Sequence, residues 1–117
     1  MKTSDYIPLI AEKLKKIDPY KVILFGSHAY GQPGEDSDID ILVVTSDNYV
    51  PNNFKDRISI ELKVSSVISD IKEKCPVDLI VHTIPMHEKF LALGSMFSKE
   101  IIQKGRILYE KDNRRMA

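Results

Sequence analysis

The sequence contains a single cysteine, no tryptophan and no long apolar run. Cys75 alone cannot form an internal disulfide, which fits a reducing compartment. No stretch approaches the roughly 18 apolar residues of a membrane-spanning helix, and the N-terminus lacks the apolar core of a signal peptide. We therefore expect a cytoplasmic protein that has no membrane segment.

An excess of charge of one sign is also missing, because 17 acidic side chains balance 17 basic ones. Proteins built to coat nucleic acid usually carry a basic excess, so nucleic acid is not expected as a partner. No repeat or Gly/Ser-rich linker divides the 117 residues. We expect a single domain over residues 1–117, with a frayed, charged tail at 110–117.

The pattern of apolar residues predicts an α/β fold, a small mixed β-sheet with helices mainly on one face. Short β-branched runs indicate strands, and apolar residues at helical spacing indicate helices. The expected strands are residues 21–25, 38–44, 77–81 and 106–109. The expected helices are a first one around residues 7–17, a single turn at 27–30, one long helix at 54–74, and two more at 85–93 and 97–104.

Two aspartates, Asp38 and Asp40, alternate at the start of the second expected strand. Alternation places both side chains on the same face of the sheet, where they repel each other unless a cation lies between them. Hard divalent cations such as Mg²⁺ prefer such oxygen ligands. An acidic loop is the simple alternative, but it does not explain Asp40, because a charge flanked by Ile39 and Ile41 is costly to bury without a partner.

A third aspartate, Asp78, is the only charged residue in the expected strand 77–81. It could reach water at the strand end or pair with a lysine. If its strand lies beside the strand 38–44, Asp78 instead completes a cluster of three carboxylates. We favour the cluster, because a costly charge then recurs on a second apolar strand.

The dipeptide Gly26-Ser27 ends the first expected strand. Glycine lets a backbone approach a phosphate closely, and N–H groups at the start of a following helix favour an anion. Gly-Ser is common at strand ends, so it becomes informative only through its distance from the aspartate pair. An acid pair that holds metal, beside a turn that holds phosphate, predicts a nucleotide site.

Together, the Gly-Ser turn, ten intervening residues and the Asp-x-Asp pair resemble the signature of the DNA polymerase beta-like nucleotidyltransferase superfamily. The sequence is most similar to the minimal nucleotidyltransferases of that superfamily. The similarity extends to the strand 77–81 and to the Lys-Gly-Arg-Ile-Leu-Tyr ending at 104–109. It implies a polymerase beta-like fold and a magnesium-dependent nucleotidyltransferase with ATP as the nucleotide donor.

The resemblance also implies a role for each candidate residue. Asp38 and Asp40 would hold two Mg²⁺ ions, and Asp78 would bind the second ion and help to remove the proton of the acceptor hydroxyl. Gly26 and Ser27 would bind the outer phosphates. Phosphoryl transfer depends mainly on positioning and charge neutralisation, and these residue types can provide both.

One departure concerns the turn, in which many relatives read Gly-Ser-Arg-Ala-Arg-Gly. Here His28 and Tyr30 occupy the positions of the two arginines. This replacement does not remove the expected activity, but it weakens the expectation that the turn adds strong cationic contacts to phosphate, and the nucleotide preference stays open.

The resemblance implies a partner as well, since minimal nucleotidyltransferases typically act with a helical HEPN protein, often a toxin. The family precedent is antitoxin action by transfer of AMP to a tyrosine of the partner. Because the chain is short, we expect a homo- or hetero-oligomer in which a second chain supplies the acceptor or part of its pocket. Two alternatives are a small-molecule nucleotidyltransferase that modifies an antibiotic-like hydroxyl, and a non-catalytic antitoxin or nucleotide-binding module that acts by occlusion.

The remaining histidines, His82 and His87, lie five residues apart near the end of the third expected strand. No further Cys or His completes a zinc set around them. We expect both to be surface or packing residues.

Overall fold

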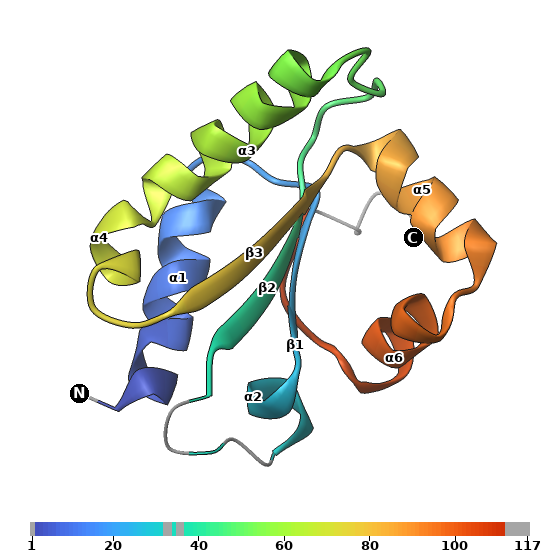
Figure 1. Ribbon diagram of the computed structural model, residues 1–117. Coiled ribbons are helices and arrows are strands. Elements are labelled where there is room, and N and C mark those ends of the chain that lie inside the picture. The colour runs from blue at the N-terminus through green and yellow to red at the C-terminus, as the bar shows by residue number, and fades with distance from the viewer. Residues whose placement is uncertain (1, 32–33, 35–36, 112–117) are drawn as a thin grey trace.

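A four-stranded mixed sheet organises the computed structural model, which describes residues 2–31, 34 and 37–111 (Figure 1). The central strand β1 is antiparallel to both of its neighbours, β2 and β4, whereas β2 runs parallel to the edge strand β3. The strand order is therefore β3-β2-β1-β4. The strands are β1 (Lys21–Phe25), β2 (Ile39–Val44), β3 (Val77–His82) and β4 (Arg106–Glu110). All four predicted strands form, and the α/β fold class is confirmed.

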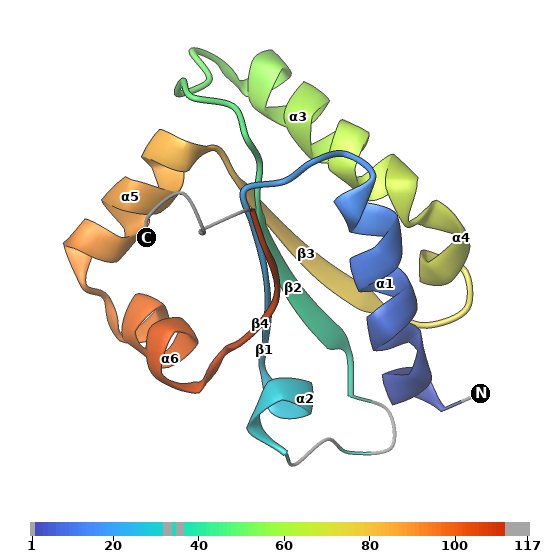
Figure 2. The ribbon, with the colours of Figure 1, turned by 180° about the vertical axis from the view of Figure 1, so that it is seen from behind.

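Helices cover both faces of this sheet, with α1, α3 and α4 on one side and α5 and α6 on the other (Figures 1 and 2). The prediction that helices lie mainly on one face therefore needs refinement, although the larger core does lie under α1, α3 and α4. The helices are α1 (Tyr6–Lys15), which follows a 3-10 turn at Thr3–Asp5, then α2 (Ser27–Tyr30), α3 (Phe54–Val67), α4 (Ser69–Lys72), α5 (Ile84–Leu93) and α6 (Met96–Lys104).

The long helix expected at 54–74 is divided into α3 and α4. The division falls at Ile68, whose φ of −112° and ψ of 20° are not helical. Ile68 itself is fully buried in the main core. On either side of the break, Val64 of α3 and Ile71 of α4 both pack in the same core.

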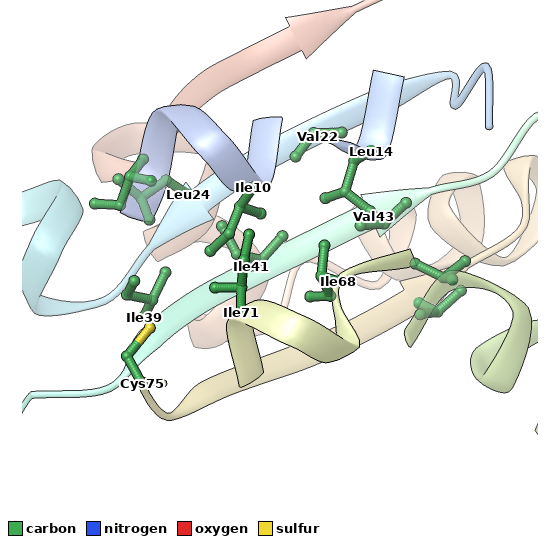
Figure 3. Close-up of a cluster of buried hydrophobic side chains, with 13 residues drawn as sticks. Ile10, Leu14, Val22, Leu24, Ile39, Ile41, Val43, Ile68, Ile71 and Cys75 are labelled. Atoms are coloured by element: carbon green, nitrogen blue, oxygen red, sulfur yellow. The ribbon is translucent and has the colours of Figure 1, made fainter. Parts of the chain in front are cut away.

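The main core fills the space between the sheet and α1, α3 and α4 (Figure 3). Strand β2 supplies Ile39, Ile41 and Val43, all fully buried. Since side chains alternate along a strand, the residues between them face α5 and α6. There Leu42 joins the second, smaller cluster. Its buried members are Ile23, Phe25, Leu42 and Ile101.

The last strand follows directly on α6 and is tied to β1 and to Tyr20 at its far end. Gly105 ends α6, as predicted, and its N–H donates to the carbonyl oxygen of Ile101 at 2.8 Å. Glu110, predicted to begin a frayed tail, instead belongs to β4 and forms an ion pair with Lys21 at 3.2 Å. The Lys111 N–H donates to the Tyr20 carbonyl oxygen at 2.9 Å. The rest of the predicted tail, 112–117, lies outside the described residues.

Among the residues that the structure describes, no helix is long and apolar enough to cross a membrane.

Candidate active site

Two of the three candidate carboxylates meet across neighbouring strands. Asp40 on β2 lies opposite Asp78 on β3 in the parallel register. Register partners in a sheet project to the same face. That face is the one covered by α5 and α6, because Ile39 and Ile41 on either side of Asp40 point into the main core. The structure therefore brings Asp40 and Asp78 together, as predicted.

The environment of Asp40 disfavours its charged form. Burial raises the pKa of the Asp40 carboxyl, and the charge of Asp78 and a hydrogen bond with the Asp78 carboxyl raise it further. The charge of Asp38 adds to this shift, and His28 opposes it. Asp40 thus lies among like charges that a bound cation would neutralise.

The other two aspartates differ from the prediction in their surroundings. Asp78 is exposed, because β3 is an edge strand, so its charge is not costly in the way that the sequence suggested. Asp38 is also exposed and lies one residue before β2, which begins at Ile39 instead of at 38. Sequence patterns do not fix which strand occupies an edge.

A metal ion can be tested against this donor set. Within the described part of the chain, no group of three or more His, Cys, Asp or Glu side chains is arranged to hold a metal ion, so the predicted cluster of three carboxylates is reduced here to the pair Asp40 and Asp78. The Asp40–Asp78 pair alone offers carboxylate oxygens from two strands, with Asp38 close enough to shift the pKa of Asp40. Hard oxygen ligands with an excess of negative charge fit Mg²⁺, which usually keeps several waters and needs few protein ligands.

The turn at Gly26 packs directly against Asp40. Gly26 has φ 74° and ψ −165°, a conformation that is essentially restricted to glycine. A Cβ atom built on Gly26 would overlap the Asp40 carboxylate oxygen Oδ2. Ser27 then begins α2, whose residues Ala29 and Tyr30 donate their N–H groups to the Gly26 carbonyl oxygen at 3.0 and 3.1 Å. The glycine is therefore required by both the backbone and the neighbouring carboxylate.

His28 and Tyr30, which stand where many similar sequences have arginine, make different contacts. His28 Nε2 lies 3.1 Å from the Ser37 carbonyl oxygen and so ties α2 to the segment before β2. The Tyr30 hydroxyl is buried, with no hydrogen-bond partner among the described residues. Burial raises the pKa of Tyr30, and the negative charges of Glu100 and Asp40 raise it further. Glu100 on α6 was not singled out in the sequence, because no local signal connects it to the turn.

The histidine pair lies at the far end of β3, on the same face of the sheet. His82 Nδ1 lies 3.4 Å from His87 Nδ1. His87 is only 5% exposed and stacks on Phe90 with ring centroids 5.9 Å apart. His87 is thus a packing residue, as expected.

The family model described as "Polymerase beta, Nucleotidyltransferase" matches residues 9–114, which is most of the chain. The chain therefore belongs to the polymerase beta nucleotidyltransferase family, and the resemblance read from the sequence is confirmed.

One relative in sequence is a protein of Methanocaldococcus jannaschii named "Putative protein adenylyltransferase". The two are 49% identical over an alignment of 57 residues, and the match covers 44% of this chain and 57% of the relative. The match thus spans little more than half the length of that relative.

Solved structures share the fold at lower identity. A "putative nucleotidyltransferase" from Sulfolobus solfataricus aligns with a TM-score of 0.61 and 20% identity, over 95% of this chain and 86% of its own. A structure described as a toxin-antitoxin with AMP-PNP aligns with a TM-score of 0.51 and 21% identity, over 97% of this chain and 77% of its own. Both similarities establish the fold.

Proposed function

We propose that this chain is a magnesium-dependent nucleotidyltransferase that transfers AMP from ATP to a hydroxyl group on a partner protein. The observation that carries the proposal is the register pairing of Asp40 with Asp78, beside a glycine turn that packs against Asp40. The sequence relative named as a protein adenylyltransferase supports a protein acceptor. The structural neighbour crystallised with AMP-PNP supports an adenine nucleotide.

In this proposal, Asp38, Asp40 and Asp78 hold two Mg²⁺ ions, and Gly26 and Ser27 bind the outer phosphates through the Gly26 N–H and the Ser27 side chain. Bound Mg²⁺ supplies charge neutralisation for the attacking and leaving oxygens of an in-line displacement. The exposed edge position of Asp78 leaves its carboxylate open to an incoming acceptor.

The bonds that change are those of a nucleotidyl transfer. The acceptor oxygen forms a bond to the α-phosphorus of ATP, and the bond from that phosphorus to the bridging oxygen breaks, so that pyrophosphate leaves. The acceptor proton passes to Asp78. No protein nucleophile is needed, since this chemistry depends on positioning and electrostatic stabilisation.

We further propose that the acceptor is a hydroxyl, of tyrosine by family precedent, on a helical HEPN-type toxin, so that this chain acts as its antitoxin. The structural neighbour described as a toxin-antitoxin supports a partner of this kind. Asp78 is exposed on an edge strand, which leaves its carboxylate accessible to a macromolecular acceptor.

The test is to incubate the protein with ATP labelled on the α-phosphate, Mg²⁺ and a candidate HEPN toxin, and to follow label on the toxin. Asp40→Asn and Asp78→Asn should abolish labelling, because each removes a ligand of the same site. Glu88→Gln, which removes an exposed acid on α5, is the matched control and should label normally. Labelling that persists in Asp40→Asn would refute the proposed site.

The same experiment separates the two alternatives. Label on a small hydroxylated compound, with none on protein, would identify a small-molecule nucleotidyltransferase. Neutralisation of the toxin that survives Asp38→Asn combined with Asp40→Asn would identify a non-catalytic antitoxin that acts by occlusion.

A further inference from the structure

A lysine from the far end of the chain lies over the turn of the candidate site. Lys104 Nζ lies 5.6 Å from the centroid of the Tyr30 ring. Tyr30 is the last residue of α2, the short helix that starts at Ser27, and Lys104 is the last residue of α6. An ammonium group within about 6 Å of an aromatic ring is held there by the ring's electrostatic field.

The backbone fixes the position of Lys104 through the next residue. Gly105 packs so closely that an added Cβ would crowd both the Ile101 carbonyl oxygen and Ile23 Cγ2 on β1. Arg106 then enters the sheet opposite Leu24, one residue before β1 ends. The end of α6 is therefore attached to the same end of β1 from which the Gly26-Ser27 turn leaves.

The charges around this turn are unbalanced. Asp40 and Asp78 are register partners beside it, Asp38 is near enough for its charge to raise the pKa of Asp40, and Glu100 contributes a further negative charge near Tyr30. The turn itself, 26–31, contains neither lysine nor arginine. A triphosphate would bring additional negative charge to this place, which cations would have to neutralise.

We propose that Lys104 is the cation that binds the outer phosphates of the nucleotide, and that the ring of Tyr30 holds it above the turn. This inference rests on the proposed function, since it assigns a phosphate-binding residue to the same nucleotide site. Lysine acts on phosphate as a mobile point charge. An ammonium on the flexible Lys104 stem can move from the ring toward phosphate oxygens while its helix stays fixed.

A structural role for Lys104 makes a different prediction. A lysine in the last turn of a helix also interacts favourably with the helix dipole, whatever ligand is bound. In that case its removal would lower the stability of the protein without changing nucleotide affinity.

The experiment measures binding of ATP and of AMP, each with Mg²⁺, to the full chain by isothermal titration calorimetry. Lys104→Met should weaken ATP binding by about 10-fold or more, the loss typical of one charged contact. AMP binding should change less than about twofold, because AMP lacks the outer phosphates. Lys99→Met, which removes a lysine near Gly94 at the other end of the same helix, is the matched control and should bind ATP normally.

Substitutions of the ring complete the test. Tyr30→Phe keeps the aromatic face and should preserve ATP affinity, whereas Tyr30→Leu should weaken it. Because the ring acts through the lysine, the double variant Lys104→Met with Tyr30→Leu should lose no more ATP affinity than Lys104→Met alone. Circular dichroism melts establish that each variant is folded, and Lys104→Arg should restore ATP binding if Lys104→Met is unfolded.

Each outcome has a distinct meaning. If the wild-type protein binds neither nucleotide, the proposed function itself fails. If the wild-type protein binds ATP and Lys104→Met binds it equally well, only the role of Lys104 is overturned. If Lys104→Met lost equal affinity for ATP and for AMP, that role would also be overturned, because the effect would be unrelated to the outer phosphates.

Discussion

Acidification from about pH 7.5 to about pH 4 should destabilise the fold through His87 in particular. This side chain is 5% exposed, lies beside His82 and stacks on Phe90. Burial is the main cause that lowers the pKa of His87 from 6.5 to about 4, and the charges of His82 and Lys21 add to it. The folded protein therefore keeps this imidazole neutral at pH values where the unfolded chain binds a proton.

The size and sign of the effect follow from the two pKa values. Above about pH 6.5, both states are neutral at this position and His87 adds no pH dependence. Between pH 6.5 and 4, the unfolded chain binds more protons than the folded one, so the free energy of unfolding falls as the pH falls. The fall in the pKa of His87 from 6.5 to about 4 corresponds to about 3 kcal/mol, which is reached near pH 4.

The assay is urea unfolding of the wild-type protein and of His87→Gln at several pH values. The other titrating groups are common to both proteins, so the difference in their unfolding free energies reports the titration of His87 together with its effect on the neighbouring His82. Between pH 7.5 and pH 4, the free energy of unfolding of the wild-type protein should fall by about 3 kcal/mol more than that of His87→Gln. His28→Gln, measured in the same way, controls for the removal of a histidine that is only half-buried. A difference that stays constant with pH would refute the assigned burial effect.

Four further predictions concern the candidate site. Gly26→Ala should cost at least about 2 kcal/mol in urea unfolding and abolish nucleotide transfer, because the backbone conformation and the Asp40 carboxylate both exclude a side chain. Asp40→Asn should raise the unfolding free energy of the metal-free protein while abolishing transfer, since it removes a charge that burial and two neighbouring carboxylates disfavour. Tyr30→Phe should raise the unfolding free energy by about 1 kcal/mol, because it removes a buried hydroxyl that has no partner among the described residues. Millimolar Mg²⁺ with ATP should raise the melting temperature by mass action, and Asp78→Asn should reduce that response in thermal scanning.

Features that depend on neighbouring residues were predictable from the sequence. The run Lys21–Phe25 forms a strand with those bounds, because its β-branched apolar residues fit a strand buried on both faces. Asp40 could be singled out because a charge between two isoleucines interrupts an otherwise apolar strand. Gly26-Ser27 was informative only through its spacing from that charge.

Features that depend on the strand order were less predictable. Asp78 was expected on a buried strand, but β3 forms the edge of the sheet and leaves this side chain exposed. The sequence predicted one continuous helix over 54–74, and no local signal marks the break at Ile68. The position of Lys104 over Tyr30 depends on the return of the last strand to β1, which no local pattern encodes.

The same alternation that builds the core of this protein also fixes the position of its candidate site. Along β2, Ile39 and Ile41 fill the main core, and Asp40 between them faces Asp78 and the turn. A shift of β2 by one residue would turn every side chain to the opposite face, so that Asp40 would enter the main core and isoleucine would face the turn. An unpaired carboxylate in that core is far more costly than the half-buried carboxylate observed. The residue that the proposed chemistry needs therefore also helps to specify the register of the strand that carries it.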